Sequence, residues 1–518
     1  MNLLLVLLIA GAVLAAASFL AVLSYGHFAR RSRGEDSFAL ATEPAGSALD
    51  RLLEGQALEA EGQSGLVLLS DNLDAFAIRV LTARTAGRSL DLMYYYWKDD
   101  LTGRLLAREI VAAADRGVRV RLLIDDINTR GRDKTYLALD GHPNIAVRLF
   151  NPSRARQFGL RRGLEMLLRA VTINRRMHNK AWIADGRIAI VGGRNIGDEY
   201  FDAGRDSNFR DLDVAMIGPV VSQTEEVFDR FWNSEVTMPI KALVRRPEAR
   251  LEKLRARHAA LELREETRPY TARVLSRPSV AAMIEGGLRL HWTAEARIVA
   301  DPPEKAAGKG DDNWMMKTLM PVLASADRTV SLTSPYFVPG HEGVRGLTLM
   351  AEAGVRVAVL TNSLAATDVA AVHGGYAPYR KPLIAGGVEL YELQPFMRQE
   401  RMSLLGSSAA SLHTKAFTVD GEIGFAGSFN FDPRSAGLNT EMGVLFVAPD
   451  LVAEMDAIFA EETAPQMSWR LELSASGGLL WRGENDGRFE TLESEPEASL
   501  ARRLVAAIVG WLPIESQL

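Results

Sequence analysis

The sequence predicts an α/β protein of two duplicated halves, with mixed sheets flanked by helices, preceded by an N-terminal transmembrane helix. Three observations support this: a long apolar run at the N-terminus, alternating strand-like and helix-like segments, and the return of that alternation about 235 residues later. At 518 residues the chain is long enough for several domain-sized units.

The N-terminal segment is the most apolar part of the chain. Leu3 to Leu23 form an almost unbroken apolar run, long enough to cross about 30 Å of hydrocarbon as a helix. A cleaved signal peptide is the alternative, because residues 15–18 (AAAS) could be a cleavage site, but no Lys or Arg precedes the run. The arginines that follow, at positions 30, 31 and 33, predict a single-pass protein of the bacterial inner membrane with its catalytic part in the cytoplasm.

Composition excludes several classes of protein. The chain has 60 Lys and Arg against 65 Asp and Glu, so it lacks the basic excess of a bulk nucleic-acid binder. It contains no cysteine, which excludes disulfides, thiolate metal sites and a thiol nucleophile.

A strand–helix–strand unit occurs twice. Residues 89–96, 103–116 and 117–125 form the first copy, and the glycine that opens GVRVRLLID returns 237 positions later in GVRVAVLTN (354–362). We therefore expect an anchor (1–40), a first half (41–245), a helical linker (246–270), a second half (271–460) and a C-terminal extension (461–518) with an amphipathic helix. Residues 301–312 read as an exposed loop.

A motif of His-x-Lys-x4-Asp followed by Gly-[Gly/Ser]-x-Asn is present in each half. Its members are His178, Lys180, Asp185 and Asn195, and, 235 positions later, His413, Lys415, Asp420 and Asn430. Residues two apart in a strand face the same side, so each histidine projects with its lysine. An Asp-Gly turn then folds the chain back and brings the asparagine alongside. Two such patches facing each other would clamp a phosphodiester and supply both a nucleophile and an acid.

This double motif resembles that of the phospholipase D superfamily. The flanking segments 191–200, 334–339 and 427–435 are similar to those of the bacterial cardiolipin synthases, and 438–442 (LNTEM) and 373–376 (HGGY) to their C-type group. The resemblance implies phosphatidyl transfer without a metal or other cofactor. It implies that His178 forms a phosphohistidine, that His413 acts as acid and base, and that Lys180, Lys415, Asn195 and Asn430 bind phosphoryl oxygens.

Further residues have expected roles. Asp213 and Glu441, each just before an apolar strand, match the resembled family's positions for carboxylates that orient the histidines. Asp185 and Asp420 belong to the catalytic motif but end their strands, so we interpret them as structural supports. His373 and Tyr376 are either acceptor-recognition residues or packing residues.

The implied partners are phospholipids and the membrane, without nucleic acid. The resemblance suggests phosphatidylglycerol, reacting with a second phosphatidylglycerol or with phosphatidylethanolamine, and a small accessory protein is compatible with it. Hydrolysis to phosphatidic acid is an alternative, and a nuclease-type phosphodiesterase is a third hypothesis.

Two segments suit a membrane surface. Residues 151–180 hold eight Arg and Lys against one Glu, interleaved with apolar residues, as in a cationic helix lying among anionic headgroups. A solvated helix packed on the core is the alternative. Residues 500–512 (LARRLVAAIVGWL) form either a second membrane contact or a docking helix.

Overall fold

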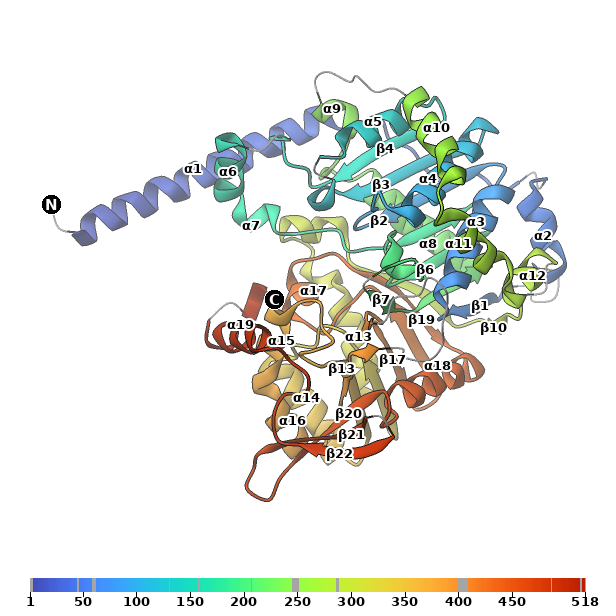
Figure 1. Ribbon diagram of the computed structural model, residues 1–518. Coiled ribbons are helices and arrows are strands. Elements are labelled where there is room, and N and C mark those ends of the chain that lie inside the picture. The colour runs from blue at the N-terminus through green and yellow to red at the C-terminus, as the bar shows by residue number, and fades with distance from the viewer. Residues whose placement is uncertain are drawn as a thin grey trace.

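The computed structural model has two sheet-containing halves stacked on each other, with a long N-terminal helix projecting from one side (Figure 1). It describes residues 3–43, 46–57, 62–129, 131–156, 159–205, 207–244, 251–285, 288–397, 409–485, 487–512 and 515–517.

Helix α1 (Leu3–Ser32) contains the apolar run and continues beyond it. It is the one helix among the described residues that is long and apolar enough to cross a membrane. Its outer part is exposed, whereas Tyr25 and Ala29 near its end are buried against the first half. The Tyr25 hydroxyl donates a hydrogen bond to the Pro152 carbonyl over 2.8 Å. The end of α1 is therefore fixed to the folded part of the chain.

The first half is built on a nine-stranded mixed sheet. In spatial order its strands are β10 (His291–Thr293), β1 (Ser64–Leu69), β8 (Asp213–Ile217), β6 (Ile188–Gly192), β5 (Ala181–Ala184), β2 (Ser89–Tyr94), β3 (Arg119–Asp125), β4 (Ile145–Phe150) and β9 (Thr237–Pro239). Strands β2, β3 and β4 are parallel, and the other pairs are antiparallel. Helices α3 (Asn72–Thr85), α4 (Leu101–Asp115), α5 (Asp133–Asp140) and α8 (Pro219–Trp232) flank it.

The second half repeats this order. Its strands are β11 (Ala296–Ala300), β19 (Met442–Val447), β18 (Ile423–Gly427), β17 (Ala416–Val419), β12 (Thr329–Thr333), β13 (Arg356–Asn362), β14 (Glu389–Leu393), β20 (Ser468–Leu473), β21 (Leu479–Asn485) and β22 (Arg488–Leu492). Strands β12, β13 and β14 are again parallel. Its helices include α13 (Met315–Ala324), α14 (Gly340–Glu352), α16 (Arg380–Ala385) and α18 (Pro449–Glu462). The predicted fold class, with its duplication and mixed sheets, is confirmed.

One apolar core joins the halves. Phe228 and Trp232 of α8 share it with Leu451, Val452 and Met455 of α18 and with strand residues of both sheets. Because each half covers a face of the other, neither interface face is left to water.

The expected boundaries between the halves need correction. Helices α10 (Leu251–Ala259), α11 (Thr267–Leu275) and α12 (Pro278–Ile284) pack on helices of the first half, and β10 pairs with β1. The first half therefore continues to Thr293, well past the predicted start of the second half at 271. The second sheet extends to Leu492 rather than ending at 460, because β20 pairs with β14 and extends the sheet outward.

The motif aspartates close hairpins. Asp185 and Gly186 have φ values of 55° and 65°, and Asp420 and Gly421 have values of 56° and 72°. The Asp185 carboxylate accepts hydrogen bonds from the backbone amides of residues 87, 88 and 89, and Asp420 does the same for residues 327, 328 and 329. Both carboxylates lie at the opposite ends of β5 and β17 from the histidines, which supports a structural role.

We predict that Asp185→Ala destabilises the protein by about 3 kcal/mol, because three backbone amides lose an ionised acceptor. Thermal unfolding in detergent measures this. The matched control is Asp312→Ala, which removes a carboxylate that is 92% exposed and should leave the melting temperature nearly unchanged. Loss of turnover in Asp185→Ala molecules that remain folded would contradict the structural interpretation.

Candidate active site

The two motifs meet at the boundary between the halves. His178 and Lys180 lie just before β5, and His413 and Lys415 lie just before β17. Both histidines are buried, with 8% and 5% of the residue surface exposed. Strand β7 (Ser207–Arg210) of the first half pairs in parallel with β16 (Ala409–Leu412) of the second, and Met177 forms a bridge with Thr440. These contacts bring the segment that precedes each histidine against the other half.

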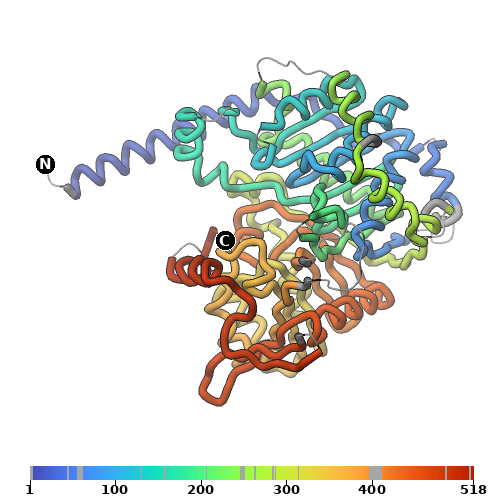
Figure 2. The backbone as a smooth tube through the Cα atoms, in the orientation of Figure 1, coloured from blue at the N-terminus to red at the C-terminus, as the bar shows by residue number. Residues whose placement is uncertain are grey.

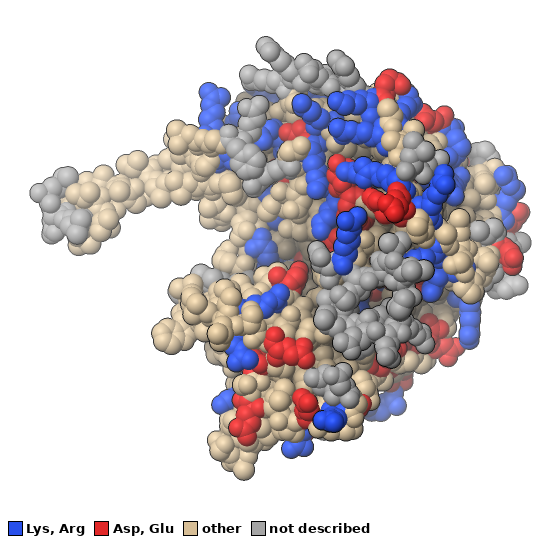
Figure 3. Space-filling view, viewed as in Figure 1, with Lys and Arg blue, Asp and Glu red and all other residues tan. Residues whose placement is uncertain are grey.

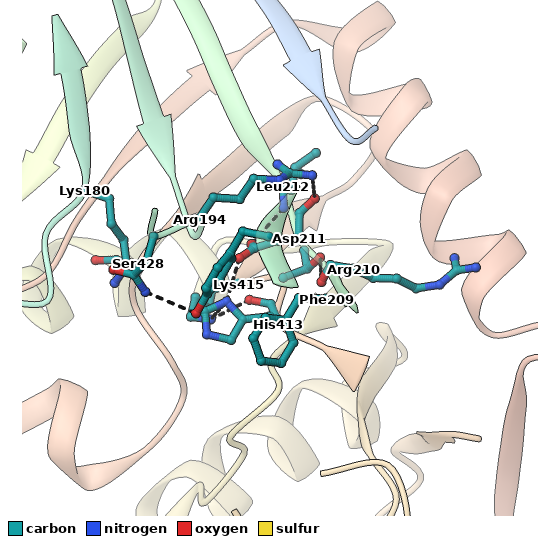
Figure 4. Close-up of polar contacts among 12 residues, drawn as sticks. Lys180, Arg194, Phe209, Arg210, Asp211, Leu212, His413, Lys415 and Ser428 are labelled. Atoms are coloured by element: carbon teal, nitrogen blue, oxygen red, sulfur yellow. Dashed lines mark hydrogen bonds and ion pairs between the residues drawn. The ribbon is translucent and has the colours of Figure 1, made fainter. Parts of the chain in front are cut away.

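The halves exchange the carboxylates that hold the histidines. The His178 backbone amide donates to Thr440 over 2.8 Å, and its Nδ1 lies 2.8 Å from Glu441 Oε2. The His413 amide donates to Arg210 over 2.7 Å, and its Nδ1 lies 2.6 Å from Asp211 Oδ2. A carboxylate at Nδ1 selects the tautomer that leaves Nε2 with a lone pair. Figure 4 shows His413 and Asp211 together with Lys415 and Lys180.

The expected role of Asp213 is wrong. Its carboxylate accepts hydrogen bonds from the Arg79 guanidinium over 2.8 Å and from the Arg194 amide over 3.2 Å, so it is a buried partner of arginines. Strand register explains the error, because Gly192 pairs with Asp213 whereas Gly427 pairs with Gly443. The correct alignment sets DLDVAMI against EMGVLFV and would have matched Asp211 with Glu441. For Glu441 the expected contact is present.

The two orienting carboxylates have different surroundings. Glu441 also accepts hydrogen bonds from the hydroxyls of Ser428, over 2.5 Å, and Ser435, over 3.1 Å. Burial raises the pKa of Glu441, but His178 and Lys180 outweigh burial and leave it below its ordinary value. By contrast, burial leaves the pKa of Asp211 raised despite Lys415 and Arg194.

A buried pair behind Glu441 was missed by the sequence analysis, which read residues 301–312 as an exposed loop. Asp301 and Lys305 are 1% and 0% exposed and lie 2.8 Å apart. Asp301 accepts the Glu441 amide over 2.9 Å, and Lys305 donates to the Ser435 carbonyl. This pair fixes the backbone that carries the orienting carboxylate. Nothing in the charged, Pro-containing segment 301–312 distinguishes these two residues from its other charged residues.

Burial also governs the charge of the site. It lowers the pKa of His178 to about 4, and it lowers that of His413 well below the ordinary value. The pKa of Lys180 is also well below its ordinary value, and that of Lys415 falls to about 8. Desolvation and crowding of like charges favour the neutral forms, so a phosphate anion placed between these groups would draw protons onto them.

The asparagines and aromatic rings complete the site. Asn195 donates to the Tyr200 hydroxyl over 3.2 Å, while Asn430 is buried and its Oδ1 has no hydrogen-bond partner among the described residues. The Tyr95 ring lies 5.1 Å from the His178 ring, and Tyr200 lies 5.2 Å from the His413 ring.

His373 and Tyr376 make packing contacts. They lie on α15 (Ala370–Tyr376), beneath α19 (Leu500–Trp511), and both are buried. His373 Nε2 contacts the Arg380 guanidinium, and the Tyr376 ring stacks near Arg380 at 5.0 Å. Of the two interpretations left open, these contacts favour packing over acceptor recognition.

Two buried imidazoles, each oriented by a carboxylate and flanked by a lysine, define a phosphodiester-processing site of the phospholipase D type. The family described as "Cardiolipin synthase, PLD-like domain" matches residues 81–232 and 319–463, which are more than half of the chain. The chain therefore belongs to this cardiolipin synthase family.

Known proteins agree with this assignment. The chain is 42% identical over 459 residues to cardiolipin synthase C from Escherichia coli (strain K12), covering 88% of this chain and 96% of that protein. It is 27% identical to a cardiolipin synthase from Geobacillus sp. (strain WCH70), over 76% of this chain and 65% of that protein. The crystal structure of a phosphatidylserine synthase from Haemophilus influenzae Rd KW20 superposes with a TM-score of 0.55 at 13% identity, covering 89% of this chain and 96% of that one, and so shares the fold.

We predict that Asp211→Asn and Glu441→Gln each lower kcat by about 100-fold or more, because an amide no longer fixes the Nδ1–H tautomer. Steady-state turnover with the melting temperature measured in parallel tests this. Asp213→Asn is the matched comparison, since it should lower the melting temperature far more than it lowers the kcat of folded molecules. Equal kcat losses in all three variants would refute the assignment of Asp211.

Proposed function

We propose that this protein is a cardiolipin synthase that transfers a phosphatidyl group from one phospholipid to a hydroxyl of another. The observation that carries the proposal is the crossed arrangement, in which each imidazole is held at Nδ1 by a carboxylate of the other half. The Nε2 atoms of both rings are then available for chemistry at one phosphorus, beside Lys180 and Lys415.

In the first step, His178 Nε2 attacks the phosphorus of the donor and the bond from phosphorus to the headgroup oxygen breaks. His413 gives its Nε2 proton to the departing oxygen, so phosphatidylglycerol releases glycerol and phosphatidylethanolamine would release ethanolamine. The phosphatidyl group is now bound to His178, and Lys180, Lys415, Asn195 and Asn430 stabilise the charge on its oxygens.

In the second step, His413 takes the proton from a glycerol hydroxyl of the acceptor phosphatidylglycerol. That oxygen attacks phosphorus, the phosphorus–nitrogen bond breaks, and cardiolipin leaves. The Asp211 carboxylate stabilises the imidazolium form of His413, which is present before the first step and again after the second; between the two steps His413 is the neutral base.

The location of the protein follows from the same function. Its substrates are membrane lipids, and α1 would anchor the chain in the bacterial inner membrane. Arg30, Arg31 and Arg33 after the apolar run favour a cytoplasmic catalytic part. The purified chain assayed alone, and then with membrane extract, tests whether a small accessory protein is required.

We predict that kcat/KM for phosphatidylglycerol falls as the pH rises above about 8, because burial places the pKa of Lys415 at about 8 and its charge is lost above that value. A pH–rate profile measures this limb. Lys415→Arg keeps its charge and should move the limb to higher pH at a lower maximal rate. If kcat/KM of the Lys415→Arg variant falls at the same pH as that of the native chain, a group other than Lys415 causes the fall.

The function itself is tested with labelled phosphatidylglycerol in lipid nanodiscs, with and without phosphatidylethanolamine. We expect labelled cardiolipin from the native chain and a loss of about 1,000-fold or more in His178→Ala and His413→Ala. Label retained on the protein after an alkaline quench, and absent from His178→Ala, would support the phosphohistidine.

Other products would support other functions. Phosphatidic acid alone would indicate hydrolysis by the same residues. Cleavage of DNA by the native chain, with neither lipid product, would refute the proposal. The order of donor and acceptor follows from whether glycerol or ethanolamine is released.

A further inference from the structure

Two short helical segments, one in each half, carry stripes of exposed apolar side chains. The first stripe lies on α6 (Leu160–Leu168) and α7 (Ala170–Ile173). It consists of Leu160, Leu164, Leu167 and Val171, which are 91%, 54%, 58% and 77% exposed. On α19 it includes Leu500, Leu504, Ile508 and Trp511, at 84%, 61%, 52% and 92%. Spacings of three and four residues place each stripe on one side of its helix.

Most arginines of these segments are turned towards the fold; Arg161 is exposed. Arg162 and Arg169 are buried, and Arg169 donates to Glu165 and Asn151 over 2.7 and 3.0 Å. On α19, Arg502 donates to the Leu364 carbonyl and Arg503 to the Ala498 carbonyl. A helix on a water-facing surface buries its apolar side chains and exposes its charged ones. Helices α6, α7 and α19 instead expose leucines and direct most of their arginines into the fold. This arrangement also corrects the expectation for residues 151–180, because much of their positive charge is paired inside the fold rather than presented to headgroups.

The first stripe is attached to the end of the anchor helix. The Arg169 guanidinium lies 3.2 Å from the centre of the Tyr25 ring, and that of Arg154 lies 4.4 Å from the centre of the Phe28 ring. Tyr25 lies two residues after the end of the apolar run of α1. Helix α6 therefore lies at the level where α1 leaves its apolar part (Figure 1).

The second stripe lies on the same side of the molecule. Helix α19 packs so closely on α15 that a Cβ at Gly374 would lie 2.5 Å from the Ala506 carbonyl oxygen. After α19 the chain returns to the boundary between the halves (Figure 2), where Gln517 accepts a hydrogen bond from Asn174 over 2.8 Å and from Arg434 over 3.2 Å. Asn174 is the C-cap residue that follows α7.

We infer that α6–α7 and α19 form a two-part lipid-facing surface that lies in the same leaflet as the emerging end of α1. The partner that covers this surface is the bilayer, because the exposed apolar side chains of α6 and α7 lie beside the membrane-anchoring helix α1. In Figure 3 the projecting part of α1 and the tip of α19 are free of charged residues, and the surface is hollowed between the two lobes that bear α6 and α19. His178 follows α7 closely in the chain, so phospholipids would approach the site from the leaflet between the two stripes. This last step rests on the proposed function.

The chain has no cysteine, so single cysteines report on single positions. Nitroxide labels at Leu164→Cys, Leu504→Cys and Phe489→Cys would be compared in the full chain, in nanodiscs of phosphatidylglycerol and phosphatidylethanolamine. Phe489, on β22, is an apolar control that is 77% exposed. We expect the labels at 164 and 504 to be relaxed by oxygen and protected from a nickel chelate, with the reverse at 489.

The label accessibilities are measured without catalysis, so the lipid-facing surface can be refuted while the proposed function holds. Nickel access at 504 equal to that at 489 would overturn the two-part surface. If the label at 504 is protected but lies within measurable spin–spin distance of the same label on a second copy of the chain, that copy covers α19. This result would also overturn the lipid-facing surface.

Activity provides a second measurement. Leu504→Glu with Ile508→Glu should reduce cardiolipin formation in bilayers at least tenfold and leave the rate on dispersed short-chain phosphatidylglycerol within twofold. Phe489→Glu should change neither rate. Equal losses on both substrates would contradict an interfacial role for α19.

Discussion

The hydrogen bonds that cross between the halves at the two histidines are the constraint on which the site depends. Each histidine is held by two consecutive residues of the other half: the first accepts a hydrogen bond from its backbone amide, and the second places a carboxylate at Nδ1. These residues are Thr440 and Glu441 for His178, and Arg210 and Asp211 for His413. Neither half can orient its own histidine without the other. The shared core of α8 and α18, the pairing of β7 with β16 and the Asp301–Lys305 pair all act to keep that crossing in register.

The same crossing places four basic groups in a water-poor space. Burial then lowers the pKa of both histidines and both lysines, which favours neutral imidazoles before substrate arrives. An anionic phosphodiester reverses this balance, because its charge stabilises a lysinium and an imidazolium that the empty site disfavours. Substrate binding and preparation of the general acid are thereby linked in one electrostatic step.

Much of this arrangement could be predicted from the sequence, because local patterns carry it. The repeated motif gave the histidines, lysines and asparagines, and the Asp-Gly turns gave the hairpins. What could not be predicted depended on register and on distant contacts. The prediction of Asp213 was wrong by two positions because Asp211 and Asp213 lie at the start of the same apolar strand, and only the ladder with Gly192 shows which of them corresponds to Glu441. The boundaries were misplaced because a three-residue strand, β10, joins a sheet whose other members end more than 50 residues earlier.

The unequal surroundings of Glu441 and Asp211 have a consequence for the direction of the chemistry. Two identical subunits would offer two interchangeable histidines, and either could attack first. In a single duplicated chain the copies are free to diverge: one carboxylate receives two serine hydroxyls and remains a weak base, while the other is held without them and has a raised pKa. Duplication has thus made the two histidines inequivalent, so the fold itself can determine which of them attacks phosphorus and which transfers protons.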